Sequence, residues 1–426
     1  MKALIFAGFC ATLFAQLCTA EFRAAAVKVD ITPSTPQWLL GYGPRKHTAV
    51  HDPIFHRVLM MDDGRTQFYL VSTDLCLFSP GLYDEVAAEL KSKLNIEDKD
   101  FWWSVTHTHS APEVGPRGVY DALLKGRSEH EWDRAYTDRV RATLIQAIVE
   151  ARTKLEPARL QTGAGTSLAN INRRAKDVDG KVSLGLNPEG PTDRQIGLIK
   201  LTRPDNSTIA LLANYAIHGT VLGGKSEVIS GDAPGIVAAY IEDKLNAPVL
   251  FVNGAAGDLA PIYSVYNDPK SGHLSQFRVL LGDRILDAAN RLTAGEADVK
   301  LKAEATFMES PLKTGLQWPA ELSRYSKADA PGRTLVRLPV RFLTMKDTVM
   351  WAAPVELFSE IAINIREKSP FARTFYAGYT NGWFGYLPTK AAFAEGGYEP
   401  TTSVLTDAAE ADLTWHVLSH FKGLRQ

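Results

Sequence analysis

Two histidines spaced two residues apart are the clearest chemical signal in the sequence. His107 and His109 lie in the segment Thr-His-Thr-His-Ser at 106–110, directly after the apolar run 101–105. Residues two apart in an extended segment point to the same side, so the two imidazoles share one face. Such a pair suits a borderline cation such as zinc. It is also compatible with loop histidines whose ring nitrogens bond to backbone groups.

Further polar groups follow apolar runs in the same way. They are His218 after 209–215, Asn253 and Asp258 after 249–252, and Glu356 after 348–352. For Glu356 a structural role is also possible. Pro354 predicts a helix over 355–365, and an acidic residue in the first turn of a helix stabilises it. The aromatic and glycine-rich stretch 376–398 indicates either the wall of an organic-ligand pocket or packed core tyrosines.

The elements that must position these residues alternate between strand and helix. The predicted strands are 68–71, 101–105, 209–215, 249–253 and 348–352. The predicted helices are 82–94, 133–154, 233–245, 276–292 and 355–365. This order predicts an α/β fold with mixed β-sheets flanked by helices. In such folds, binding and catalytic groups gather in the loops beyond the strand ends.

Composition and charge exclude several classes of function. The 426 residues are 45% hydrophobic and 22% charged, which is typical of a folded globular protein. The net charge of −1 leaves no excess of positive charge to bind a nucleic-acid backbone. The glycines around 254–257 match neither a P-loop nor a dinucleotide-binding motif, so we expect no nucleotide.

The first twenty residues predict export. An uncharged run over 3–17 and small residues before Glu21 are typical of a signal peptide cleaved near Ala20, and the alternative is an N-terminal membrane anchor. We therefore expect a secreted or periplasmic protein formed by 21–426. Cleavage leaves Cys76 as the single cysteine and permits no intrachain disulfide.

Taken in order, these segments resemble the catalytic domain of the neutral/alkaline non-lysosomal ceramidase family. The resemblance spans most of 21–426, and its most specific part is the segment 106–110. The other segments that carry it are 29–33, 41–43, 72–74, 172–173, 217–218, 230–232, 257–258, 354–356 and 381–389.

The resemblance implies a zinc amidase and a role for each site residue. The implied zinc ligands are His107, His218, Glu356 and Tyr386. His109 would transfer a proton beside the metal, and Arg173 would lie near the reacting carbonyl. The expected substrate-binding residues are Tyr398, Asn253 and Asp258.

The sequence departs from the family pattern at one position of the implied site. Family members carry a serine in Gly-Asp-Val-Ser-Pro, where this chain has Ala260. Asn253 and Ser264 are candidates to supply the missing polar group. The sequence ends at Gln426, so we also expect no immunoglobulin-like C-terminal domain of the kind that longer members carry.

The expected function is zinc-dependent hydrolysis of an amide in ceramide or a related N-acylated lipid, which releases a fatty acid and an amine. Association with a membrane surface stays open. One alternative is a zinc amidase or esterase for a non-sphingolipid substrate. Another is a secreted protein without catalytic activity that retains the pocket to bind a lipid or glycan.

Overall fold

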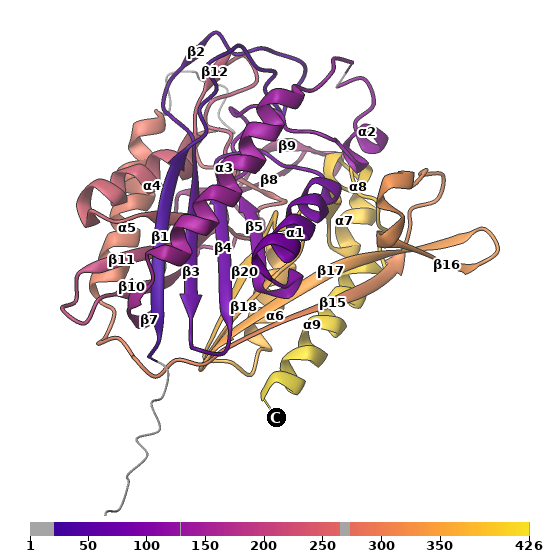
Figure 1. Ribbon diagram of the computed structural model, residues 1–426. Coiled ribbons are helices and arrows are strands. Elements are labelled where there is room, and N and C mark those ends of the chain that lie inside the picture. Colours follow the sequence, from indigo (N-terminus) through magenta and orange to yellow (C-terminus); the bar gives the residue numbers. More distant parts are fainter. Residues whose placement is uncertain (1–20, 128, 265–272, 426) are drawn as a thin grey trace, which may run out of the picture.

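The computed structural model describes residues 21–127, 129–264 and 273–425. Within these residues, three main β-sheets pack against one another, and helices cover their outer faces (Figure 1). Each main sheet combines antiparallel strands with one parallel pair. This arrangement confirms the predicted α/β class with mixed sheets flanked by helices. The predicted signal segment 1–20 lies outside the described residues, and its cleavage stays a prediction.

The first sheet is built mainly from the N-terminal part of the chain. Its elements are β1 (Arg23–Asp30), β3 (Phe55–Asp62), β4 (Gln67–Thr73), β5 (Phe101–Val105), β6 (Glu156–Pro157), α1 (Pro80–Leu94), η1 (Asp98–Asp100), α2 (Val119–Leu123) and α3 (Arg134–Thr153). The strand order is β5-β4-β3-β1-β6, and α1 connects the parallel pair β4 and β5. α1 begins at Pro80 because the Ser79 side chain accepts a hydrogen bond from the Gly81 N–H and proline suits the first turn.

The second sheet has the order β13-β11-β10-β7 and is covered by helices α4 and α5 (Figure 1). Its elements are β7 (Arg159–Thr166), β10 (Gln195–Thr202), β11 (Thr208–Tyr215), β13 (Val249–Asn253), α4 (Asp232–Leu245), η2 (Leu274–Gln276), η3 (Arg278–Asp283) and α5 (Arg284–Asn290). α4 connects the parallel pair β11 and β13. The helix predicted over 276–292 is a π-helix, η3, that continues into the short α5.

The third sheet has the order β15-β17-β18-β20, and β16 pairs with the other end of β17. Its elements are β15 (Leu301–Pro311), η4 (Ala320–Tyr325), β16 (Ser326–Ala330), β17 (Arg333–Met345), β18 (Thr348–Ala352), β20 (Arg373–Ala377), α6 (Ser359–Glu367) and α9 (Ala409–Arg425). α6 connects the parallel pair β18 and β20 and packs beside α9.

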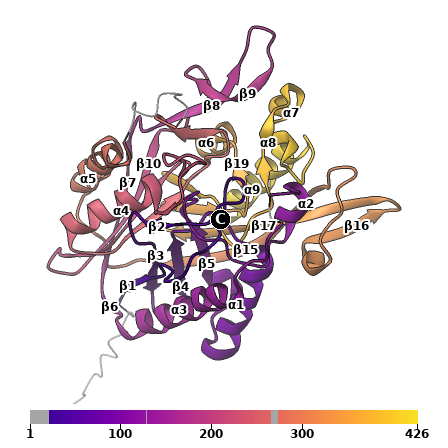
Figure 2. The ribbon, with the colours of Figure 1, turned by 90° about the horizontal axis from the view of Figure 1, so that it is seen from above.

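Short strand pairs occupy the end of the molecule at which the parallel pairs finish. They are β2 (Ala49–Val50) with β12 (Val228–Ile229), β14 (Leu259–Pro261) with β8 (Asn170–Lys176) and β9 (Val182–Asn187), and β19 (Glu356–Leu357) with β21 (Tyr386–Leu387). The short helices α7 (Lys390–Glu395) and α8 (Tyr398–Thr401) follow β21. Viewed from this end, the hairpin of β8 and β9 projects beyond the sheets (Figure 2).

Asn253, at the end of β13, joins all three main sheets. Its side-chain amide donates to the carbonyl oxygens of Thr106 at 3.1 Å and Ile217 at 2.7 Å, which follow β5 and β11. Its side-chain oxygen accepts from the Ile217 N–H, and its backbone carbonyl accepts from the Gly378 N–H after β20. The loops after β5, β11 and β20 therefore converge on one buried residue.

The prediction of a helix over 355–365 is wrong at its start. Glu356 lies in β19, where its N–H donates to the Gly385 carbonyl at 3.0 Å and pairs it with β21. α6 begins only at Ser359, whose N–H donates to the Asp258 carboxylate at 2.7 Å. Pro354 is therefore not in a helical first turn, because β21 takes the hydrogen bonds that a helix would have used.

Candidate metal centre

Two histidines and a glutamate from different sheets meet below the surface. His107 follows β5, His218 follows β11, and Glu356 lies in β19 after β18. Glu356 Oε2 is 3.3 Å from Nε2 of His107 and 3.2 Å from Nε2 of His218. The possible ligand atoms of the three residues all lie within 4.8 Å of one another, and all three side chains are buried. The structure therefore brings together three of the four residues predicted as zinc ligands.

Backbone carbonyls fix the tautomer of both histidines. Nδ1 of His107 lies 2.8 Å from the Cys76 carbonyl oxygen, and Nδ1 of His218 lies 2.8 Å from the Ala256 carbonyl oxygen. A carbonyl only accepts, so each Nδ1 carries a hydrogen and donates it. The Nε2 atom of each ring is then the one that faces Glu356, where a metal ion would bind.

Glu356 is held by an aromatic cage. Trp383 Nε1 donates to Glu356 Oε1 at 2.9 Å, and the Tyr379 hydroxyl donates to Oε2 at 3.4 Å. The Tyr379 ring also stacks on His107, with 4.1 Å between ring centroids. Sequence reasoning missed both residues: they lie in the aromatic stretch 376–398, but no spacing singles out the two that surround the glutamate.

Tyr386, the fourth predicted ligand, lies beside Glu356 and is bonded to Arg173. Tyr386 pairs with Glu356 in the parallel register of β19 and β21. Arg173 Nη2 donates to the Tyr386 hydroxyl at 3.0 Å, and Nη1 donates to Nε2 of His218 at 3.0 Å. Burial and the charge of Glu356 raise the pKa of Tyr386 well above its usual value, whereas Arg173 lowers it.

Arg173 is itself held by a buried carboxylate that sequence reasoning missed. Its Nε donates to Glu399 Oε1 at 3.1 Å, and its Nη2 donates to the Gly257 carbonyl at 2.8 Å. Glu399 also accepts from Arg174 Nη1 at 2.7 Å. The only sequence signal for Glu399 was its place directly after Gly-Gly-Tyr at 396–398.

The donor set fits a cation. Two neutral imidazoles and a carboxylate offer only acceptor atoms at 3.2–3.3 Å, an arrangement that is repulsive unless a proton or a metal ion lies among them. Burial lowers the pKa of His107, but the Glu356 charge outweighs it and raises that pKa to about 10. Burial and then Arg173 lower the pKa of His218 to about 3. Two imidazoles and one carboxylate are ligands that zinc accepts while leaving a position open.

His109 lies beside this cluster. Its Nε2 is 3.2 Å from Nε2 of His107, and its buried Nδ1 has no hydrogen-bond partner among the described residues. The ring packs against Gly41, where φ is +107° and a Cβ atom would lie 2.5 Å from the imidazole. Tyr42 meets the ring edge at 4.9 Å between centroids. Any residue larger than glycine at position 41 would displace His109.

Two predicted substrate-binding residues lie elsewhere. Asn253 is fully buried and uses its amide to join strand ends. Asp258 is buried as well, and its carboxylate accepts from the Ser359 N–H and hydroxyl and from Asn172 Nδ2. Burial raises the pKa of Asp258 to about 7. Both residues position the loops behind the pocket and neither lines it, and their contact with substrate stays a prediction.

Comparisons with known proteins identify the family. The sequence profile described as "Neutral/alkaline non-lysosomal ceramidase, N-terminal" matches residues 22–261, which is more than half of the chain. The chain belongs to the neutral/alkaline non-lysosomal ceramidase family. Within this family, neutral ceramidase B of Dictyostelium discoideum is 25% identical over 232 residues, covering 51% of this chain and 30% of that relative. Neutral ceramidase A of the same organism is 28% identical over 199 residues, covering 44% and 26%. The matched segments thus span less than a third of these relatives.

A solved ceramidase shares the fold over most of the chain. The crystal structure of neutral ceramidase from Pseudomonas aeruginosa superimposes with a TM-score of 0.77, covering 95% of this chain and 75% of that one at 18% identity. A structure described as a ceramidase complexed with C2 gives the same TM-score at 16% identity. Of the predicted ligands in this ceramidase-family chain, His107 and His218 lie within the matched residues 22–261, and Glu356 and Tyr386 lie beyond them.

A pocket of about 430 Å³ leads to the metal-centre residues of this family member. His109, Arg173 and Tyr386 line it, together with Tyr398, whose ring meets that of Tyr386 edge to face at 5.6 Å. Ala260 and Ser264 also line it, whereas Asn253 does not. Of the two candidates to replace the hydroxyl of the family serine, Asn253 and Ser264, only Ser264 therefore lines the pocket.

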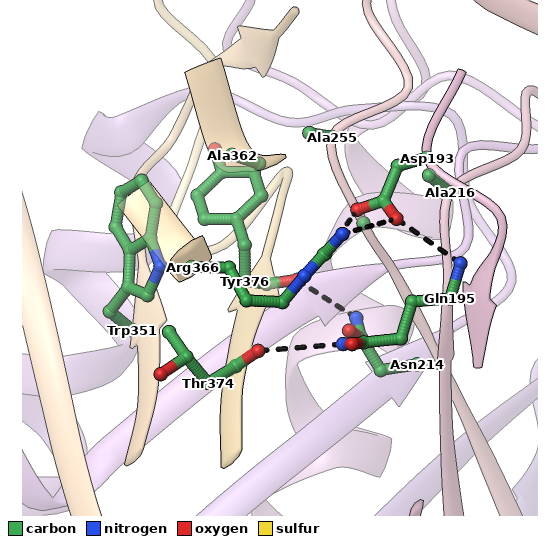
Figure 3. A pocket seen from close by; sticks show the side chains of 11 residues that line it. Asp193, Gln195, Asn214, Ala216, Ala255, Trp351, Ala362, Arg366, Thr374 and Tyr376 are labelled. Carbon is green, nitrogen blue, oxygen red and sulfur yellow. Dashed lines mark hydrogen bonds and ion pairs between the residues drawn. The ribbon is translucent and has the colours of Figure 1, made fainter. Parts of the chain in front are cut away.

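A second cavity, between the second and third sheets, is too small for substrate. It measures about 10 Å³, the space of about one water molecule. Arg366 reaches across it from α6 and binds the Asp193 carboxylate with both terminal nitrogens, at 2.7 and 3.0 Å (Figure 3). We assign this cavity a packing role and place the functional site at the larger pocket.

Proposed function

We propose that this ceramidase-family chain is a zinc-dependent amide hydrolase acting on an N-acylated lipid such as ceramide. The products are a free fatty acid and the amine. The observation that carries the proposal is the contact of His107, His218 and Glu356 with one another, next to a pocket that His109, Arg173 and Tyr386 line. Within the described residues no helix has the length and apolar character needed to cross a membrane.

The residues predicted to hold zinc are His107, His218, Glu356 and Tyr386. A zinc ion bound there would polarise the amide carbonyl and lower the pKa of a water molecule to about 7. The chain prepares both histidines for this role by fixing each Nδ1 on a backbone carbonyl. It prepares Glu356 through the hydrogen bonds from Trp383 and Tyr379.

Arg173 is the proposed stabiliser of the oxyanion. Its guanidinium lines the pocket and lies within 3.0 Å of both the His218 ring and the Tyr386 hydroxyl. Burial would lower its pKa, but the surrounding acidic groups, first Tyr386 and then Glu399, raise that pKa well above its usual value. The positive charge is therefore permanent, and it lines the pocket in which the amide oxygen would become negative.

His109 is the proposed proton carrier to the leaving amine. Its Nε2 lies at the edge of the cluster, 3.2 Å from Nε2 of His107, and its ring lines the pocket. Burial and the neighbouring His107 and His218 lower the pKa of His109 well below its usual value. A ring with a lowered pKa is neutral near pH 7, so His109 can accept a proton from the attacking water and pass it to the leaving amine.

The test combines metal analysis with a hydrolysis assay. Purified protein should contain one zinc per chain and release fatty acid from a short-chain ceramide. His218→Ala should lose both the zinc and the activity, whereas His51→Ala, at a half-exposed histidine, should lose neither. Wild-type protein that binds no zinc, or that binds zinc but cleaves no N-acylated lipid, would refute the proposal.

A further inference from the structure

The pocket is lined by positive charge that its own residues do not balance. Arg127 and Arg173 both line it, and no aspartate or glutamate of the described residues does. Ceramide carries no charge, so a pocket built only for ceramide does not need a second guanidinium at its wall. The two arginines differ in their surroundings, and that difference points to a ligand.

The charge of Arg173 is compensated by a carboxylate, whereas Arg127 has no acidic partner among the described residues. Arg173 is paired with Glu399 at 3.1 Å. Arg127 Nη1 donates to the Tyr398 hydroxyl at 3.5 Å, and its guanidinium carbon lies 5.7 Å from the centroid of the Tyr398 ring. Across 21–127, 129–264 and 273–425, no carboxylate lies within ion-pair distance of Arg127. A guanidinium offers five N–H donors, and Tyr398 uses one of them.

Another guanidinium without an ion pair among the described residues, that of Arg45, lies against Tyr42 and His109 of the pocket wall. Arg45 is 7% exposed and donates to the backbone carbonyls of His109 and Ser226. Its Nη1 has no partner, and in the described part of the chain it forms no ion pair. Arg45 therefore adds positive potential next to His109. Charges of one sign around a cleft attract ligands of the opposite sign.

We propose that Arg127 and Tyr398 form a subsite for an anionic group, a carboxylate or a phosphate ester, on the amide substrate. The preferred substrate is then a negatively charged N-acylated amine, such as an N-acyl amino acid, rather than uncharged ceramide. This inference rests on the proposed function, because it takes the pocket to be an amide-binding site. In this proposal the Tyr398 ring separates the anionic group from the reacting end of the pocket. Tyr398 packs on Tyr386, and the Tyr386 hydroxyl accepts a hydrogen bond from Arg173.

Matched substrates that differ in a single charge test this subsite. N-lauroylglycine and N-lauroylglycinamide form the carboxylate pair, and N-lauroyl-phosphoethanolamine and N-lauroylethanolamine form the phosphate pair. We expect wild-type kcat/KM to favour the charged member of at least one pair by about 10-fold or more, because a hydrogen bond to a charged group contributes that much. The preferred pair distinguishes a carboxylate ligand from a phosphate.

Substitutions then assign the preference to Arg127. Arg127→Gln should lower kcat/KM about 10- to 100-fold for the charged substrate and less than about 3-fold for its neutral partner. Lys125→Gln removes a positive charge from an exposed position in the same loop and should change neither value. Equal use of charged and neutral substrates by the wild type, or an equal loss on both in Arg127→Gln, would overturn the inference.

A binding measurement separates this inference from the proposed function. Dodecanesulfonylglycine and dodecanesulfonylglycinamide are amide analogues that resist hydrolysis, and calorimetric titration gives their Kd values. Tighter binding of the charged analogue to wild-type protein, lost in Arg127→Gln, supports the anionic subsite even if no amide is hydrolysed. Hydrolysis of amides together with equal binding of both analogues supports the proposed function and refutes the subsite.

Discussion

Glu356 and Tyr386 are direct register partners in the parallel pair of β19 and β21. The Glu356 N–H donates to the Gly385 carbonyl at 3.0 Å, and the Phe358 N–H donates to the Leu387 carbonyl at 3.1 Å. Paired residues of neighbouring strands place their side chains on the same face. Two short strands thus hold a carboxylate and a phenol side by side, although thirty residues of sequence separate them.

Replacing the glutamate should abolish zinc binding without unfolding the protein. Glu356→Gln keeps the size of the side chain and can still accept the hydrogen bond from Trp383. It removes the negative charge that a cation needs, so we expect zinc content to fall below one tenth and activity to fall more than about 100-fold. Metal analysis measures the loss of zinc, and circular dichroism checks that the variant stays folded. Glu360→Gln, at an exposed position in α6, is the matched control and should retain zinc.

Glu399 should act on catalysis through Arg173. Glu399→Gln leaves two buried guanidiniums, of Arg173 and Arg174, without their shared negative partner. We expect the free energy of unfolding to fall by about 3 kcal/mol, as for a broken buried ion pair. We also expect kcat to fall more than KM rises, because Arg173 loses the contact that aims it into the pocket.

The neighbouring Glu395 provides the comparison for that experiment. Its side chain is 34% exposed and pairs with Arg174 and Lys176. Glu395→Gln should cost no more than about 1 kcal/mol and leave kcat unchanged. A loss of stability in Glu399→Gln with no change in kcat at a temperature where the protein is folded would show that Glu399 has a purely structural role.

The sequence predicted the bounds of the buried strands better than the pairing between distant strands. The strands Phe101–Val105, Val249–Asn253 and Thr348–Ala352 have the predicted bounds, because continuous apolar runs are typical of buried parallel strands. The helix start near Glu356 was wrong because the partner strand β21 lies far along the chain. A local pattern such as proline followed by an acidic residue does not reveal that pairing.

The candidate site was predictable in part. His107, His218 and Glu356 follow strand ends, and the family resemblance grouped them with Tyr386. The hydrogen bonds that Asn253 and Asp258 make to neighbouring loops were not predictable, because a polar residue after a strand gives the same sequence pattern whether it faces a ligand or a backbone group. The carbonyls of Cys76 and Ala256, which orient the histidines, carry no sequence signal because every residue has one.

Restoring the family serine should increase activity. Ala260 lines the pocket and is only 3% exposed, and it lies in β14 opposite Ile171. Ala260→Ser adds a hydroxyl at this wall. One donor to a developing oxyanion contributes about 100- to 1,000-fold, so we expect at least a 10-fold rise in kcat on short-chain ceramide.

Ser264 provides the complementary test of that idea. Its hydroxyl lines the same pocket and donates to the Pro261 carbonyl at 3.2 Å. If Ser264 supplies the missing donor, Ser264→Ala should lower kcat, and the double variant with Ala260→Ser should recover it. Unchanged rates in all three variants would show that the reaction does not use a hydroxyl at this wall.

Stability should depend on pH through a histidine outside the site. His56 is fully buried between β3 and α3, where Nε2 donates to the Val140 carbonyl at 3.0 Å. Burial lowers the pKa of His56 to about 4 from its ordinary 6.5. Between these two values the unfolded chain binds the proton and the folded protein does not, so stability falls as the pH drops from about 6.5 to about 4.

Urea unfolding of His56→Gln measures this contribution. The variant lacks the titrating ring, so the stability difference between wild type and variant should shrink by roughly 3 kcal/mol from pH 7 to pH 4. His51→Gln, at a half-exposed histidine, should keep the wild-type pH profile. A constant difference between wild type and His56→Gln across this range would contradict the prediction.

The position of Asn253 links the integrity of the whole molecule to its chemistry. The Asn253 carboxamide holds the loops that carry His107 and His218, and the backbone carbonyl of the same residue accepts from Gly378, next to Tyr379. Separation of any one sheet from the others would therefore dismantle the ion-binding cluster before the remaining strands unfold. Enzymatic activity should then vanish earlier in a denaturation series than far-ultraviolet ellipticity, which makes turnover a sensitive reporter of native assembly in this protein.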